Sequence, residues 1–168
     1  WLLVGLALAL SAPALRAQPA RAKAVTEPRA RDLGVPFEGE PGPWNALTDV
    51  PGVEVGHTTL LRGAAVRTGV TAILPLGRRR GRCVAGVVSL NGNGEMTGAH
   101  WIRESGTLES PILLTNTHSV GVAHAALIAW GNRHFPPREV GDEAFSLPVV
   151  AETYDGLLSD INGFHVQA

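Results

Sequence analysis

Apolar positions between residues 44 and 168 fall into short runs separated by turns rich in glycine and proline. Runs of this length, with many β-branched residues, are typical of strands. The first segment, residues 46–60, predicts two short strands around a Pro51–Gly52 turn, and four later runs each predict one strand: residues 68–76, 83–90, 111–117 and 147–153. Residues 83–90 are almost continuously apolar, which predicts burial on both faces and a hairpin with the run before it.

Two segments have helical signals. Residues 99–105 predict a short helix, with Thr97 as its cap and Gly106 as its stop. Residues 118–133 predict a longer helix, with Gly131 near its C-cap. Its apolar face at three-to-four spacing would consist of Val122, Ala125, Ala126, Ala129 and Trp130. Residues 135–146 predict a loop. This order of strands and helices predicts an α+β fold, with sheet in the middle and helices outside.

The first 43 residues differ from the rest. Residues 1–24 begin with an apolar run that ends near residue 10, followed by small residues suited to cleavage. A bilayer span needs about 20 apolar residues. The pattern therefore favours a secretory signal, truncated at its start, over a membrane anchor, and predicts a secreted or periplasmic protein. Residues 25–43 contain many prolines and predict an extended or disordered linker, so residues 44–168 form the folded domain.

The amino-acid composition narrows the range of possible functions. The 168 residues are 45% apolar, enough for a core, and the net charge of −1 includes basic residues of the predicted signal. A mildly acidic mature chain argues against a nucleic-acid partner. The local exception is an arginine cluster, expected to be a solvated loop: Arg78, Arg79, Arg80 and Arg82. A single cysteine, Cys83, excludes an internal disulfide and is expected to be a small buried apolar residue.

The sequence lacks the motifs that are typical of phosphate-binding loops, metal sites and serine hydrolases of the nucleophile-elbow type. The glycine-rich stretch at residues 92–98 has no Lys-Ser/Thr ending and is not a phosphate-binding loop. The six histidines are scattered without paired-ligand spacing, so we expect no metal and no cofactor. Ser119 has no Gly-x-Ser-x-Gly context and is expected to cap the following helix.

Polar groups at the ends of apolar strands are the better candidates for a site. Glu152 follows the last strand, where a carboxylate can hold a substrate ammonium group. Tyr154, the only tyrosine, can donate to a developing oxyanion. Asn93 lies in a glycine-rich turn that could face a ligand, and Asn116 lies between a strand and a helix N-terminus. Asp155, before Gly156, is expected to be a turn residue.

Five segments carry a resemblance, and they occur in this order: "ALTDVPGVEVGHTTL", "TGVTAILP", "LNGNGEMTG", "TNTHSVG" and "ETYDGLLSDING". Together they resemble the amino-terminal part of the DmpA-like aminopeptidases, the group of L-aminopeptidase/D-amidase/D-esterases and β-peptidyl aminopeptidases. The resemblance covers about residues 32–166.

The resemblance implies a four-layer α-β-β-α sandwich, incomplete here, and a precursor that cleaves itself into two chains. The serine exposed at the start of the second chain would be the nucleophile. The enzyme would act on peptides, amides or esters with a free amino terminus, without a metal, and would assemble as a homo-oligomer. Glu152 would hold the substrate ammonium. Tyr154 would line the pocket or assist the serine, and Asn93 and Asn116 would line the same cleft.

One departure from the family pattern concerns the nucleophile. No segment matches the family's Gly-Ser processing region, and neither Ser119 nor Ser159 replaces it. The chain is therefore expected to be an amino-terminal fragment that is inactive alone. Two alternatives remain open: an amide-transferring enzyme of the ornithine acetyltransferase type, whose nucleophile is threonine, and a secreted binding domain without catalysis.

Overall fold

The computed structural model describes residues 28–136 and 146–168. The predicted signal, residues 1–24, and most of the predicted loop 135–146 lie outside the described residues. The chain divides into one unit that ends at Glu40 and a second unit, Pro41–Ala168. In the first unit the Arg31 guanidinium donates to the carbonyl oxygens of Phe37 and Glu38, at 3.2 and 3.0 Å. No helix in the described part is long and apolar enough to cross a bilayer.

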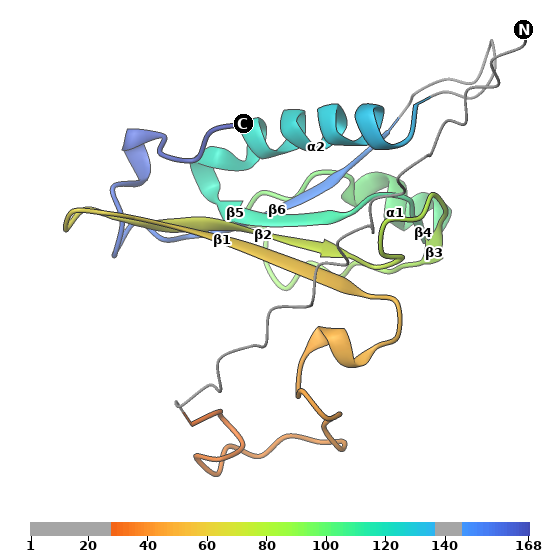
Figure 1. Cartoon of the computed structure of the whole chain (residues 1–168), viewed down its shortest axis with the longest axis horizontal. Coiled ribbons are helices and arrows are strands. Elements are labelled where there is room, and N and C mark those ends of the chain that lie inside the picture. Colours follow the sequence, from red (N-terminus) through yellow and green to blue (C-terminus); the bar gives the residue numbers. More distant parts are fainter. Residues whose placement is uncertain (1–27, 137–145) are drawn as a thin grey trace, which may run out of the picture. The chain divides into compact units, whose positions relative to one another are not determined.

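The second unit contains a four-stranded sheet in the order β1-β2-β5-β6 (Figure 1). β1 (Glu54–Arg62) and β2 (Val66–Leu74) form an antiparallel hairpin. β5 (Ile112–Asn116) runs antiparallel to β2, and β6 (Val149–Thr153) runs parallel to β5. The strands predicted within residues 68–76, 111–117 and 147–153 are therefore confirmed.

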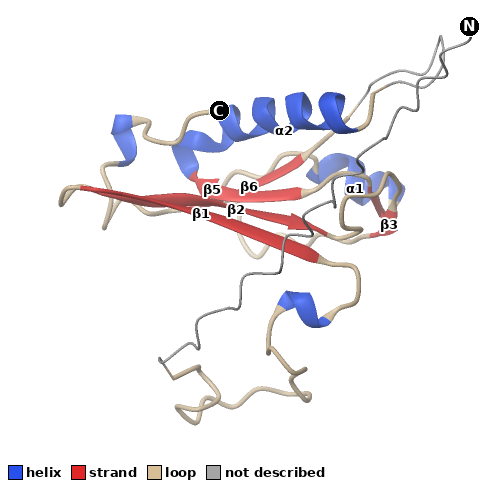
Figure 2. Cartoon of the chain, viewed as in Figure 1, coloured by secondary structure: helices blue, strands red, loops and turns tan. Residues whose placement is uncertain are grey.

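Helix α2 (Val120–His134) connects the two parallel strands, as a parallel pair requires a crossover. Figure 2 shows it lying along one face of the sheet. Its buried residues Val120, Ala123 and Leu127 pack against Val150 of β6, with Leu113 and Trp130 partly buried beside them. This packing gives the sheet its first core.

The predicted apolar face of α2 is wrong, because Ala125 and Ala129 are exposed. Apolar side chains occur almost all around this helix, so their spacing did not single out one face. The predicted helix over residues 118–133 is confirmed to within two residues at each end, and Gly131 lies in its last turn, with Phe135 as the C-cap.

A second core lies on the other face of the sheet. Val149 and Val150 are consecutive strand residues, so their side chains point to opposite faces. Val149 packs with Ile102 of α1 (Ala99–Ser105) and Leu108 of β4 (Thr107–Leu108), and half-buried Cys83 lies against this cluster. The predicted helix over residues 99–105 and its stop at Gly106 are confirmed, with Gly106 at a φ of 67°. Sheet and helices together form the predicted α+β fold.

The prediction for residues 83–90 is wrong. Only β3 (Cys83–Val84) is a strand, and it pairs with β4, not with β2. Val84 and Val88 are each 93% exposed and Leu90 is 97% exposed. An apolar run is buried only where another layer covers it, and within residues 28–136 and 146–168 no layer covers these side chains.

The first predicted strand of residues 46–60 is a 3-10 helix, η1 (Leu47–Asp49). The Asp49 carboxylate accepts hydrogen bonds from the N–H groups of Trp44 and Ala46, at 2.9 and 3.0 Å. Such side chain to backbone bonds compete with strand pairing. The second predicted strand is confirmed as β1.

Thr97 does not cap α1, because the N-cap residue is Gly98, with a φ of 72°. The Thr97 hydroxyl instead donates to the Pro148 carbonyl oxygen at 2.7 Å and accepts from the Val150 N–H at 2.8 Å. Residues 95–97 thereby extend the sheet beyond β6, with Met96 bridged to Ala151.

Replacing Thr97 with valine should lower the free energy of unfolding by about 1–3 kcal/mol, because the Val150 N–H loses its acceptor inside the fold. Urea unfolding of the intact protein measures the change. Thr97→Ser keeps the hydroxyl and should stay near the wild type. A Thr97→Val protein as stable as the wild type would contradict this role.

Candidate functional site

The carboxyl ends of β5 and β6 meet at one edge of the sheet because the two strands are parallel. Their register places Thr115 opposite Glu152 and Asn116 opposite Thr153. The Thr153 hydroxyl donates to the Thr115 carbonyl oxygen at 3.2 Å, which adds a bond between the strands. The fold therefore brings two predicted site residues, Glu152 and Asn116, to neighbouring positions.

Glu152 is half-buried, and none of the ion pairs in the described part of the chain involves its carboxylate. Its backbone N–H donates to the Glu95 carbonyl oxygen at 3.0 Å, so the main chain is held on the side away from β5. Its Oε2 atom is buried and has no hydrogen-bond partner among the described residues. Since an unpaired buried carboxylate oxygen is costly, this position favours a cationic or N–H-bearing partner.

The loop that contains Asn93 lies against this carboxylate. A Cβ atom on Gly94 would be only 2.9 Å from Glu152 Oε1, so the missing side chain permits the close approach. The Asn93 N–H donates to Asn91 Oδ1 at 2.9 Å, an Asx turn that shapes the loop. The Asn93 side chain itself is exposed.

Asn116 is engaged within the fold. The residue is 3% exposed, and its Nδ2 donates to the Thr68 hydroxyl at 2.9 Å. Its Oδ1 accepts from the Ser119 N–H at 3.0 Å, which caps the 3-10 helix η2 (Thr117–Ser119). These bonds tie β5, β2 and the start of α2 together, so the structure gives Asn116 a positioning role at this edge.

Tyr154 comes directly after β6 and is 67% exposed. Its ring folds over the following turn, since a Cβ atom on Gly156 would be 2.6 Å from the phenol oxygen. Its hydroxyl has no hydrogen-bond partner in the part of the chain that the structure describes. The phenol is therefore available near the strand end that carries Glu152.

Sequence reasoning missed two further buried polar atoms. Like Glu152 Oε2, Ser119 Oγ and Asp155 Oδ1 have no partner among residues 28–136 and 146–168. Ser119 occupies the N-cap position of α2, but its hydroxyl makes no capping bond. Asp155 is in the predicted turn, where its carbonyl oxygen accepts from Leu158 and Ser159 at 2.9 Å. All three atoms belong to segments at the carboxyl ends of β5 and β6, and no sequence signal reports burial of this kind.

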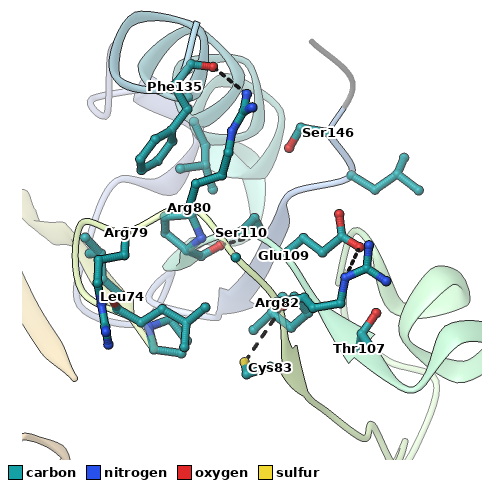
Figure 3. Close-up of a pocket in the computed structure, with 18 of the residues that line it drawn as sticks. Leu74, Arg79, Arg80, Arg82, Cys83, Thr107, Glu109, Ser110, Phe135 and Ser146 are labelled. Atoms are coloured by element: carbon teal, nitrogen blue, oxygen red, sulfur yellow. Dashed lines mark hydrogen bonds and ion pairs between the residues drawn. The ribbon is translucent and has the colours of Figure 1, made fainter. Parts of the chain in front are cut away.

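A cleft of about 600 Å³ lies at the opposite end of these strands, beside the start of β5 and the segment before β6. Figure 3 shows Arg79, Arg80 and Arg82 along it. Arg80 donates to the Phe135 carbonyl oxygen at 2.9 Å, and Arg82 lies 3.6 Å from Glu109. The arginines are exposed, as predicted for a solvated loop. None of the four predicted site residues lines this cleft.

The described residues also contain no group of three or more histidine, cysteine, aspartate or glutamate side chains arranged to hold a metal ion. The candidate site therefore consists of the Glu152 carboxylate, the loop at Gly94, the Tyr154 phenol and the supporting amide of Asn116.

Comparison with known proteins agrees with the resemblance of the five segments. The chain is 51% identical over 150 residues to the β-peptidyl aminopeptidase BapA of Sphingosinicella microcystinivorans, covering 83% of this chain and 36% of that protein. The chain thus spans about a third of this curated relative's length.

Solved structures give the same result. The L-aminopeptidase D-Ala-esterase/amidase of Ochrobactrum anthropi, described as a prototype of the serine aminopeptidases and a variant of the Ntn hydrolase fold, superposes with a TM-score of 0.75 at 48% identity. The match covers 84% of this chain and 42% of that one. A β-aminopeptidase from Burkholderia sp. superposes with a TM-score of 0.72 at 52% identity, covering 83% and 40%.

Residues 45–168 match peptidase family S58, and this range contains every helix and strand described above. The resemblance to the DmpA-like aminopeptidases is thereby confirmed, and the chain belongs to peptidase family S58.

Proposed function

We propose that this chain is the part of a longer serine aminopeptidase that holds the amino terminus of the substrate. The observation that carries the proposal is the Glu152 carboxylate, whose buried Oε2 has no partner in the described fold. The family match and the aminopeptidase relatives support hydrolysis. They favour it over both an amide-transferring enzyme and a binding domain.

An aminopeptidase must recognise a free ammonium group. A carboxylate is the side chain that binds such a group best, because the hydrogen bonds are charge-assisted. Glu152 is available for this contact, since one oxygen lies over Gly94, which has no side chain, and the other has no partner in the part of the chain that the structure describes. A substrate ammonium would satisfy the carboxylate and would orient the first residue of the substrate.

The remaining candidates take supporting roles in this proposal. Tyr154 would donate from its phenol to the oxygen that becomes negative during attack, or to the nucleophile. Asn93 would line the cleft from the adjacent loop. Asn116 would keep η2 and the strand ends in position through its two hydrogen bonds.

The nucleophile would come from a second chain of the same precursor. A serine at a chain start attacks the scissile carbonyl carbon, while its own amine accepts the hydroxyl proton and later returns it to the leaving group. Exposed apolar side chains such as Val84, Val88 and Leu90 support the presence of a further layer, because patches of this kind mark interaction surfaces.

We also propose that the protein is exported. The apolar run and small residues of segment 1–24 support this proposal, with a mature start between residues 12 and 25.

The test is selectivity for the free amine. The intact protein, produced from its complete gene, should hydrolyse an amino acid p-nitroanilide at least about 100-fold faster than the same compound with an acetylated amine, since acetylation removes the charge that Glu152 holds. Equal rates would contradict the aminopeptidase proposal. Transfer of the acyl group to an added amine, without net hydrolysis, would favour the acetyltransferase alternative.

A further inference from the structure

Strand β1 forms an open edge of the four-stranded sheet. It hydrogen-bonds to β2 on one side only, and no other strand of the described residues pairs with its outer side. Eight of its nine residues are exposed. Figure 1 shows it at the free edge of the sheet. An edge strand of this length presents unpaired N–H and C=O groups that can accept a further strand.

Natural edge strands usually carry features that block such pairing. Common ones are a proline, a bulge, a charge in the middle of the strand or a very short length. The sequence of β1, EVGHTTLLR, contains no proline, and its formal charges stand only at its two ends, Glu54 and Arg62. All nine residues pair with β2 in one continuous register, so no bulge interrupts the strand.

The sequence of β1 is complementary to itself when reversed. In an antiparallel pair of two copies centred on Thr58, Glu54 lies opposite Arg62 of the other copy. Val55 then lies opposite Leu61, and Thr58 lies opposite Thr58. Opposite charges, apolar pairs and threonine pairs are the combinations that stabilise facing strands. Moving the register by one residue places Val55 opposite Arg62, which loses the charged and the apolar matches and leaves only a threonine pair, Thr58 opposite Thr59.

The exposed side chains agree with this register. Val55 and Leu61 are 41% and 64% exposed in the chain by itself, although both are large and apolar. Residues that face each other here are an even number of positions apart in the strand, so each pair lies on one face of the sheet. In the proposed dimer, Val55 of each copy would cover Leu61 of the other, so both apolar side chains of each copy would become less exposed.

The charges at the strand ends are available for this pairing. Arg62 has no ion-pair partner among residues 28–136 and 146–168. Glu54 lies 3.4 Å from Arg78 of its own chain, and both side chains are more than half exposed. A carboxylate accepts several hydrogen bonds, so Glu54 can contact a second guanidinium.

From these observations we propose that β1 pairs with β1 of a second copy of this protein, antiparallel and centred on Thr58, so that the four-stranded sheets of the described residues join into one continuous sheet across a two-fold axis. The pairing is isologous, because the same edge serves both copies. It does not depend on the proposed catalytic activity, since β1 carries none of the candidate site residues.

Cross-linking tests the register. In the intact protein with Cys83→Ser, Thr58→Cys places two thiols opposite each other at the axis, so oxidation or a short bis-maleimide should join most chains into dimers. Gly56→Cys in the same background is the matched control, because residue 56 faces Leu60 of the other copy. Absence of a Thr58→Cys dimer, or equal yield from Gly56→Cys, overturns the proposal. If another segment of the same polypeptide pairs with this edge of β1, no Thr58→Cys dimer will form.

Charge exchange provides an independent test. Sedimentation velocity at low salt should show that Glu54→Arg and Arg62→Glu each weaken dimerisation about tenfold, since both ends then carry like charges. Mixing the two variants should restore association, because every facing pair is again of opposite charge. The double variant should behave like the wild type. Controls with the same charge changes on α1, Glu104→Arg and Arg103→Glu, should have no effect. A monomeric wild type, or no recovery on mixing, would refute the pairing.

Discussion

Glu152→Gln in the intact protein is expected to lower kcat/KM for substrates with a free amino terminus by about 30- to 150-fold. The estimate is the loss of about 2–3 kcal/mol, typical of a hydrogen bond to a charged group. Glutamine keeps the size of the side chain and its contact with Gly94 but removes the negative charge. The free energy of unfolding should not fall, because the charge has no partner in the described fold. Steady-state kinetics and urea unfolding measure the two quantities.

The control and a second variant isolate the ammonium contact. Glu95→Gln removes a charge from the exposed neighbouring segment and should leave kcat/KM unchanged. Gly94→Ala should raise KM by displacing the Glu152 carboxylate, whereas Gly92→Ala, which has open space around it, should not. If Glu152→Gln lowered the rates for free and acetylated amines equally, Glu152 would not be the ammonium-binding group.

The second large effect is expected from Gly69→Ala, which should destabilise the protein by about 1–3 kcal/mol or more. A Cβ atom at Gly69 would overlap the carbonyl oxygen of Thr58 on the facing strand, and backbone cannot yield as a flexible side chain does. The Gly69 carbonyl also accepts the Thr115 hydroxyl at 3.0 Å, so a shift of β2 would reach β5. The midpoint of urea unfolding reports the loss.

Gly56→Ala is the matched control for Gly69→Ala. Gly56 lies in the neighbouring strand of the same hairpin, but no atom of the described residues is within 4 Å of a Cβ atom placed on it. Alanine at this position should leave the unfolding midpoint near the wild-type value or raise it slightly. A Gly69→Ala protein no less stable than Gly56→Ala would show that the two strands do not approach as closely as described.

The local elements were predictable because their signals come from residues that are close in sequence. The helix Ala99–Ser105 ends at Gly106 because glycine adopts the left-handed conformation without strain. The strands Ile112–Asn116 and Val149–Thr153 follow from short β-branched runs bounded by turn residues. The family resemblance rests on five ordered segments of the same kind.

The predictions that failed depended on partners distant in the chain. The run 83–90 is apolar enough to be buried, but most of it has no strand beside it in the described fold. Thr97 has the chemistry of a helix cap, yet its hydroxyl bonds to Pro148 and Val150, about fifty positions away. Both outcomes depend on which segments the fold brings together.

For the candidate site, the sequence by itself determined the types of chemical group available: the Glu152 carboxylate and the Tyr154 phenol after an apolar strand, one asparagine in a glycine-rich turn and one between a strand and a helix. The tertiary structure decided how deeply these groups are buried and which hydrogen-bond partners they have. It left Glu152 Oε2 buried and without a partner among the described residues, placed Gly94 against the other oxygen, and engaged the Asn116 amide in two bonds. The physical reason is that the identity of a side chain sets which bonds it can make, whereas burial and the supply of partners depend on how strands from distant positions pack.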